Sequence, residues 1–437
     1  MTTTAGGTHS RSRLRRDPRP LILLEGAILL PAIPLLLFPE ALPAATVGAL
    51  LALAAVWLLS LALAPALLPA TPFNLLFLLW GGALIAGILV SADPIETLPK
   101  ATGLILGLAV WRYAVVATRT RQQLAAAVAL FLLLSLGFTL LGALNMRELP
   151  KIPLLSGLNP FQAIALPGLL NLAVHPNQLA ALICIFLPLL FSLSLGLAGE
   201  QYPRWLRPAL ALATALTVLV LVLTQSRGGW VGAAAGLFAL LVLWAAVLPP
   251  SGARRAARLL AAAVVVAALG ALLWIGPGRV RQLWLDPPAE SALGTFTTLN
   301  YRQALWPWAI TAIGDFPFSG VGLGAFRQVV FRFYPIALTP DPDVGHAHNI
   351  FLQTALDVGL PGLVVYGAIL LVAAAVGWRV ARRDAGLRPV ALGLLAGLVG
   401  LHVFGLADAL VLGSKMGLVF WFALGLLAAM NKEELAP

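Results

Sequence analysis

Apolar runs about as long as a bilayer core is thick recur along almost the whole chain. About 20 consecutive apolar residues allow a helix to cross the hydrocarbon core of a membrane. Twelve segments fit this description, at residues 21–38, 44–64, 73–91, 101–118, 124–144, 176–198, 208–224, 228–248, 257–276, 350–377, 389–406 and 410–430. The sequence therefore predicts an all-α integral membrane protein with about 12 transmembrane helices, organised as a single polytopic membrane domain over residues 1–437.

Composition supports this class and argues against others. The chain is 60% hydrophobic and only 10% charged, whereas a soluble globular domain carries roughly 25% charged residues. A net charge of +11 is also typical of proteins that bind nucleic acid. Most basic residues, however, fall in the connections between apolar runs, so we expect a lipid bilayer and no nucleic acid as partner. Cys184 is the only cysteine, which excludes an intrachain disulfide.

The distribution of arginine indicates how the chain crosses the membrane. Clusters at Arg11–Arg19, Arg254–Arg258 and Arg379–Arg388 fall in alternate connections, and basic residues accumulate in cytoplasmic loops. Both termini are therefore expected in the cytoplasm. The first apolar run, 21–38, could be the core of a secretory signal. Its length and the many runs that follow it favour an uncleaved first span.

Two long polar stretches then lie on the outer side, at residues 145–176 and 277–347. The second is a large extracytoplasmic loop between the ninth and tenth spans. Loops of that length are usually functional or disordered, and the many Trp, Phe and Tyr residues of this one favour order. Within it, residues 301–313 are expected to form a short amphipathic helix, and residues 316–324 a series of turns.

Three span starts on the outer side carry polar residues that suit an anionic ligand. They read His175-Pro176-Asn177-Gln178, Ser226-Arg227-Gly228-Gly229-Trp230 and His346-Ala347-His348-Asn349. A helix start offers unpaired N–H groups and the positive end of the helix dipole. Together with Arg227 and the arginines of the large loop, these starts predict a site for a phosphorylated group.

Each of these residues also has a structural interpretation. Ser226 and Asn349 are suitable helix N-caps, and Arg227 could extend its guanidinium to lipid headgroups. A single histidine at a membrane interface is more often structural than catalytic.

The sequence gives no sign of a cofactor. Gly320, Gly322 and Gly324 lack the strand–helix setting of a dinucleotide-binding fold. We find no phosphate-binding loop, no HExxH motif and no cluster with metal-ligand spacing, so neither a cofactor nor a metal is expected.

The polar motifs resemble those of the O-antigen ligase and polymerase superfamily of bacterial membrane glycosyltransferases. The resemblance covers about residues 170–365 by motif, and the rest by the number of spans and the position of the loop. The matching residues are Ser226-Arg227-Gly228-Gly229-Trp230, Tyr301-Arg302 with Trp306, Pro317 to Gly324, and His348-Asn349 followed at fixed spacing by Gly359 and Gly362. The pattern does not separate ligases from polymerases or from protein O-oligosaccharyltransferases.

The resemblance implies an enzyme of the bacterial inner membrane that builds lipopolysaccharide or another cell-envelope polysaccharide. Such enzymes take a glycan from undecaprenyl pyrophosphate at the outer face of that membrane, generally without a metal. They pass the glycan to an acceptor, which is the lipid A core in the ligases and a growing polysaccharide in the polymerases.

The same resemblance, together with the chemistry of the side chains, gives each candidate residue a role. Arg227 and Arg302 are expected to bind the pyrophosphate, because a guanidinium can hold phosphate oxygens through two parallel hydrogen bonds. His348 is expected to be the general base that activates the acceptor hydroxyl. Secondary candidates are His175, His346, Asn349, Arg147, Arg279, Arg281 and Arg327.

Two other classes of function remain open from the sequence. A transporter or flippase of lipid-linked glycans would place ionisable groups near the middle of its spans or carry inverted repeats. Here the spans are nearly free of charge. A non-catalytic assembly protein would not need Arg and His at three helix starts. Convergence of Arg227, Arg302 and His348 at one outward-facing cavity would favour the enzyme.

Overall fold

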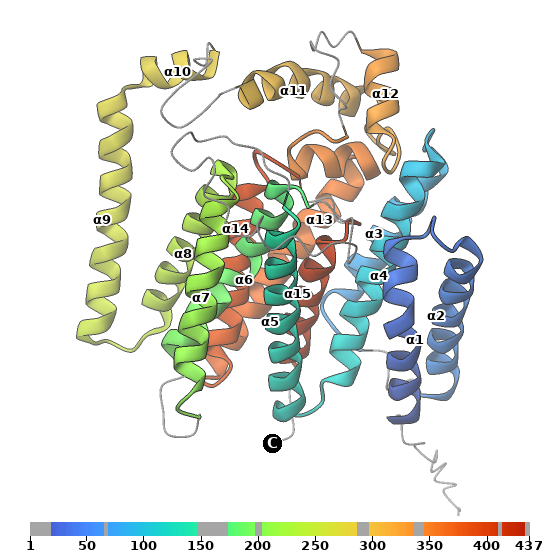
Figure 1. Ribbon diagram of the computed structural model, residues 1–437, viewed down its shortest axis with the longest axis horizontal. Helices are drawn as coiled ribbons and strands as arrows, with labels where there is room; N and C mark the ends of the chain where they lie inside the picture. Colours follow the sequence, from blue (N-terminus) through green and yellow to red (C-terminus); the bar gives the residue numbers. More distant parts are fainter. Residues whose placement is uncertain are drawn as a thin grey trace, which may run out of the picture.

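The computed structural model describes residues 19–64, 69–146, 174–196, 203–285, 297–334, 345–409 and 413–432. Over these residues the chain is helical, and the only strand-like pairing is an isolated bridge between Met146 and Val174. The helices are α1 (Arg19–Leu37), α2 (Pro43–Leu63), α3 (Asn74–Leu89), α4 (Pro94–Ala117), α5 (Arg121–Leu144), α6 (Pro176–Gly196), α7 (Leu206–Leu223), α8 (Arg227–Val247), α9 (Gly252–Ile275), α10 (Pro277–Leu285), α11 (Thr297–Asp315), α12 (Phe326–Phe333), α13 (Ile350–Arg383), α14 (Arg388–Phe404) and α15 (Gly417–Met430). In Figure 1 the long helices stand side by side, and α10, α11 and α12 lie together at one end of the bundle.

The helices match the expected spans. Among the described residues, nine helices are long and apolar enough to cross a membrane, namely α1, α2, α4 to α9 and α13. The apolar helices α3, α14 and α15 are shorter, with 16, 17 and 14 residues. Each of the twelve apolar runs coincides with one helix, which confirms the all-α membrane class. The count of twelve crossings stays a prediction, because about 17 residues is the lower limit for a span.

Capping side chains set several helix starts. The fourth helix begins at Pro94, earlier than the apolar run at 101–118 indicates. The carboxylate of Asp93 accepts the N–H of Glu96 (3.2 Å), and a proline is well suited to the first helical position. A second start, that of α5, has a capping box in which Thr120 and Gln123 satisfy each other's backbone N–H groups.

The helices that carry the polar motifs are packed closely together. The most buried span is α6, and α14 packs against both α6 and α8. Small residues allow this approach: a Cβ at Gly232 of α8 would lie 2.7 Å from the carbonyl oxygen of Gly400 on α14. The N–H of Ile350, at the start of α13, donates to the carbonyl of Gly405, just after α14 (2.7 Å). The motif-bearing ends are therefore fixed relative to one another.

A buried ion pair is an exception to the expectation that the spans are nearly free of charge. Glu25 on α1 forms a buried ion pair with Arg112 on α4. The indole N–H of Trp57 on α2 donates to the same carboxylate (3.1 Å), and its ring lies beneath the guanidinium (5.8 Å). Paired and hydrogen-bonded in this way, the two charges hold the first two helices against the fourth.

The described part of the large loop is ordered, as its aromatic content predicts. Helix α11 contains the expected segment 301–313, and turns follow it at 316–324. Helices α10 and α12 were not anticipated. Buried side chains from α11, α12 and α13, including Leu305, Phe326 and Leu356, form a small separate core. This core fixes α11 and α12 to the start of the tenth expected span.

The turns of the loop dock on a kink in α13. The kink lies at Gly359, whose φ of +73° is accessible mainly to glycine. Two backbone hydrogen bonds join the segments, from Val321 N–H to Leu356 (2.8 Å) and from Leu360 N–H to Pro317 (2.8 Å). The glycine-rich turn therefore serves as a backbone clamp, in keeping with the rejection of a dinucleotide fold.

Candidate active site

A cavity of about 200 Å³ lies where α6 and α13 begin and α14 ends. Its walls come from these three places and from the connection that precedes α15. The lining residues are His175, Asn177, Gln178, Ala181, His346, His348, Phe404, Asp408, Ala409 and Ser414. Two of the three polar span starts singled out in the sequence thus share one cavity.

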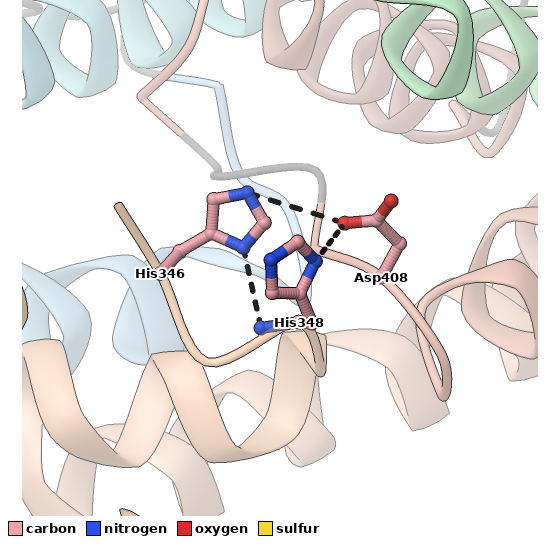
Figure 2. Close-up of side chains that lie close together, drawn as sticks. All are labelled: His346, His348 and Asp408. Carbon is pink, nitrogen blue, oxygen red and sulfur yellow. Dashed lines mark hydrogen bonds and ion pairs between the residues drawn. The ribbon is translucent and has the colours of Figure 1, made fainter. Parts of the chain in front are cut away.

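Two histidines and a carboxylate face one another at this cavity. Figure 2 shows His346, His348 and Asp408 turned toward a common centre. The distance between His348 Nδ1 and Asp408 Oδ1 is 3.1 Å, which is a hydrogen bond. His346 Nε2 lies 4.0 Å from the same oxygen, and the two imidazole centroids are 4.2 Å apart. The expected base is therefore paired with a carboxylate 60 residues further along the chain.

Asp408 is a candidate that the sequence reasoning missed. It is buried in the connection after α14, and it also accepts hydrogen bonds from the Asn177 side-chain amide and from the N–H of Ala409 (2.8 Å). Burial raises the pKa of this carboxyl, but the hydrogen bond with His348 and the charge effect of the same residue, followed by smaller effects of His346 and Arg302, outweigh it. The pKa of Asp408 is thus lowered, and the group is an anion that accepts hydrogen bonds on both oxygens.

His346 has a defined tautomer. Its Nδ1 accepts the backbone N–H of His348 (3.2 Å), so the neutral ring carries its proton on Nε2, facing Asp408. Burial, with a further contribution from His348, lowers the pKa of His346 to about 3. The three side chains also form a possible donor set for a metal ion. A metal at His346 Nε2 would move the proton to Nδ1 and break the bond from His348 N–H, so this geometry favours proton handling.

The backbone at His348 is unusual, and Asn349 follows it as a helix cap. His348 has a φ of +49°, a value that few residues with side chains adopt. The side-chain oxygen of Asn349 accepts the N–H groups of Phe351 (2.9 Å) and Leu352 (3.1 Å). The structural interpretation of Asn349 is thus confirmed, while His348 is held in a conformation of the kind that clusters at functional sites.

The start of α8 is joined to the cavity through Asn177. The hydroxyl of Ser226 donates to the carbonyl of the Asn177 side chain (2.9 Å) and accepts the N–H of Gly229 (3.2 Å). Ser226 is therefore the N-cap of α8, as interpreted from the sequence, and Arg227 is the first residue of that helix. A continuous hydrogen-bond chain leads from this helix start through Asn177 to Asp408.

Arg302 is the second expected phosphate ligand and lies on α11. Burial lowers the pKa of its guanidinium; the charge of Asp408 opposes this shift and that of Arg227 adds to it. The charges of Asp408 and Arg227 therefore both act on the Arg302 guanidinium. Its neighbour Tyr301 contacts the ring of His348 edge-on, with centroids 5.4 Å apart. The described cavity wall contains His348 and Asp408 but neither Arg227 nor Arg302, so the convergence of the three expected residues in one cavity stays a prediction.

The secondary candidates fall in different places. His175 lines the cavity, and its Nδ1 accepts the N–H of Asn177 (3.2 Å). Arg327 forms an ion pair with Glu96 (3.1 Å). The candidates Arg279 and Arg281 are exposed on α10, away from the cavity lining. Arg147 lies outside the described residues.

Comparison with known protein families supports the resemblance that the motifs carry. Residues 212–367 match the family described as O-antigen ligase. No curated protein matches the chain. The matched segment contains Arg227, Arg302 and His348, whereas Asn177 and Asp408 lie outside it. Over this segment, the chain is similar to the O-antigen ligase family, as the resemblance of its motifs predicts.

Proposed function

We propose that the protein transfers a glycan from undecaprenyl pyrophosphate to an acceptor hydroxyl at the outer face of the bacterial inner membrane. The observation that carries this proposal is the His348–Asp408 pair at a cavity beside Arg302 and Arg227. A base, its orienting carboxylate and two phosphate-binding cations are the groups that such a transfer needs.

The tautomer of His348 is suited to proton abstraction. Its Nδ1 faces the anionic Asp408, which can only accept a hydrogen bond, so the proton of the neutral ring belongs on Nδ1. The lone pair of Nε2 is then available to the acceptor hydroxyl. In the proposed step, Nε2 takes the hydroxyl proton as the oxygen attacks the anomeric carbon of the glycan. The bond from that carbon to the pyrophosphate breaks, and its electron pair leaves with the lipid pyrophosphate.

Arg227 and Arg302 serve the leaving group. Negative charge grows on the pyrophosphate as the glycosidic bond breaks, and fixed cations stabilise that charge more in the transition state than in the ground state. The charge of Arg227 lowers the pKa of Arg302, so these two partly desolvated guanidinium groups repel each other. An anion bound between them would relieve that repulsion.

The location of the site supports the expected topology. The starts of α6, α8 and α13 and the loop helices α10 to α12 lie toward one end of the bundle in Figure 1. The arginine clusters that are expected in the cytoplasm, at Arg254–Arg258 and Arg379–Arg388, lie near the other ends of α8 and α13. With both termini cytoplasmic and twelve crossings, the cavity faces outward, where a lipid-linked glycan would be presented.

The identity of the acceptor distinguishes the three types of enzyme that the proposal leaves open. Lipid A core would make the protein an O-antigen ligase, a growing polysaccharide a polymerase, and a hydroxyl side chain a protein O-oligosaccharyltransferase. Ionisable groups buried in the spans are the feature that a transporter would use. Here Glu25 and Arg112 neutralise each other beside Trp57, and Asp357 is hydrogen-bonded to Gln353 and Gly324. We therefore favour the enzyme.

The function can be tested with the purified protein in lipid nanodiscs and a defined undecaprenyl-pyrophosphate glycan. Separate reactions would contain lipid A core, free glycan or a serine-containing peptide as acceptor. The proposal expects glycan transfer to one acceptor class, with one lipid pyrophosphate released for each product. In proteoliposomes, glycan-lipid movement across the bilayer without any transfer would show a transporter and contradict the proposal.

A further inference from the structure

The strained backbone of His348 depends on contacts to the residue before it. Ala347 is fully buried. Its N–H donates to the side-chain oxygen of Gln353 (2.8 Å), and its carbonyl accepts the indole N–H of Trp306 (3.0 Å). The peptide groups on both sides of Ala347 are thereby fixed. These are the groups that connect it to His346 and His348, so the two imidazoles are placed together.

The orientation of Gln353 is set by a second buried carboxylate. The amide nitrogen of Gln353 donates to Oδ1 of Asp357 (2.9 Å), and the same oxygen accepts the N–H of Gly324 (3.0 Å). Oδ1 of Asp357 is an acceptor toward both Gly324 and Gln353, so the NH₂ end of Gln353 faces it. The carbonyl end of Gln353 must then face Ala347. A reversed amide would present two donors to each other at Ala347.

We propose that Asp357 and Gln353 are positioning residues for the base. Asp357 orients Gln353, and Gln353 holds the Ala347 peptide so that His348 keeps its left-handed conformation and its bond to Asp408. Through the N–H of Gly324, the same chain of hydrogen bonds also reaches the glycine-rich turn. This inference rests on the proposed function of His348 as base.

The geometry separates this role from direct participation. Neither Asp357 nor Gln353 lines the cavity, and both are buried. Neither can therefore touch substrate in this arrangement. Their loss should displace the base without removing a substrate contact. Displacements of about 1 Å at a reacting group can lower the rate roughly 10²-fold.

The test compares substitutions that remove or keep the acceptor oxygen. Asp357→Leu and Gln353→Leu break the chain of hydrogen bonds from Ala347 through Gln353 to Asp357, and each keeps a side chain of similar volume. Asp357→Asn keeps an oxygen that can accept from both Gln353 and Gly324. We expect each Leu variant to lower kcat about 10- to 100-fold, with KM for donor and acceptor changed less than about threefold. Asp357→Asn should restore kcat to within about threefold of the wild type.

Ser192→Ala is the matched control, because the Ser192 hydroxyl makes a buried hydrogen bond to Pro389 far from the cavity (2.7 Å). It should lower thermal stability without changing kcat. Wild-type kcat in both Leu variants would overturn the inference, and so would a parallel loss of donor binding, which would indicate general collapse of the site. If a Leu variant fails to fold, Asp357→Asn still tests the proposal. An Asn variant whose kcat falls as far as that of Gln353→Leu would contradict it, because asparagine keeps the acceptor oxygen. If His348→Ala retains turnover while the Leu variants lose it, the base assignment fails and the loop positioning stands.

Discussion

Replacement of Asp408 by asparagine removes one charge and one of the two acceptor oxygens, which together take part in three hydrogen bonds. The Oδ1 position of Asp408 receives the Nδ1–H of His348 and the N–H of Ala409, and the Oδ2 position receives the amide of Asn177. An asparagine can present an oxygen at only one of these positions. With its NH₂ toward His348, the imidazole must accept at Nδ1, and its proton moves to Nε2, the atom that should act as base.

The opposite orientation keeps the His348 bond but places NH₂ against NH₂ at Asn177. Asn177 can turn over, because the hydroxyl of Ser226 is able to donate or accept. That orientation retains the tautomer and loses only the charge that would stabilise the protonated imidazole. The first orientation, with the wrong tautomer, gives the larger expected loss of kcat, and the second, which loses only the charge, gives the smaller. We expect Asp408→Asn to lower kcat by about 10²–10⁴-fold, the range for general base catalysis, or about 3–5 kcal/mol in the barrier.

The assay is single-turnover glycan transfer in nanodiscs at saturating donor, with donor binding measured separately. Asp384→Asn is the matched control, since Asp384 is a carboxylate in an ion pair with Arg121 (2.6 Å) between α13 and α14. It should leave turnover close to the wild-type value. If Asp408→Asn binds donor normally and turns over within about threefold of the wild type, the carboxylate does not set the tautomer of His348.

Three further outcomes are expected. Arg227→Lys and Arg302→Lys should each reduce transfer at least about tenfold, because lysine keeps the charge but loses the paired hydrogen bonds; wild-type turnover in both would remove the pyrophosphate role. The pKa of His346 is about 3 in the folded protein and about 6.5 in the unfolded chain, so the unfolded state binds the extra proton and stability should fall as pH drops from about 6.5 toward 3. His346→Gln should reduce this loss of thermal stability at acidic pH. An unchanged dependence of stability on pH would contradict a buried, neutral His346. In a Cys184→Ala background, an impermeant thiol reagent applied to intact cells should label Gln282→Cys on α10 and not Arg382→Cys at the end of α13, whereas the reverse pattern would invert the topology.

Periodicity and composition were sufficient to predict the helices of the bundle, because each apolar run is long and bounded by polar residues. They did not predict where α4 begins, since the apolar pattern starts after the cap formed by Asp93. Helices α10 and α12 were missed because short segments in a polar loop lack the long apolar pattern that identifies a span. The Glu25–Arg112 pair was missed because each residue is a single charge in an apolar run.

The candidate site was predicted in part. Arg227 and His348 follow from motifs at helix starts, and Arg302 follows from a motif within the loop helix. The structure places His348 in the cavity wall, and the roles of all three residues stay predictions. Asp408 has no motif around it, and its only signal is an acidic residue at the end of the apolar run 389–406. Its role depends on a contact across 60 residues, which no local pattern encodes. The relay from Gln353 to Asp357 was also hidden, since both residues read as polar positions in an apolar helix.

The measurement that tests the central claim most directly is turnover of His348→Ala alongside binding of the donor lipid. The variant removes the base and leaves Arg227, Arg302 and the cavity in place. The account predicts a loss of kcat of about 10²–10⁴-fold with donor affinity close to that of the wild type. Near wild-type turnover in the reconstituted reaction would contradict it, and the base would then have to be sought first at His346.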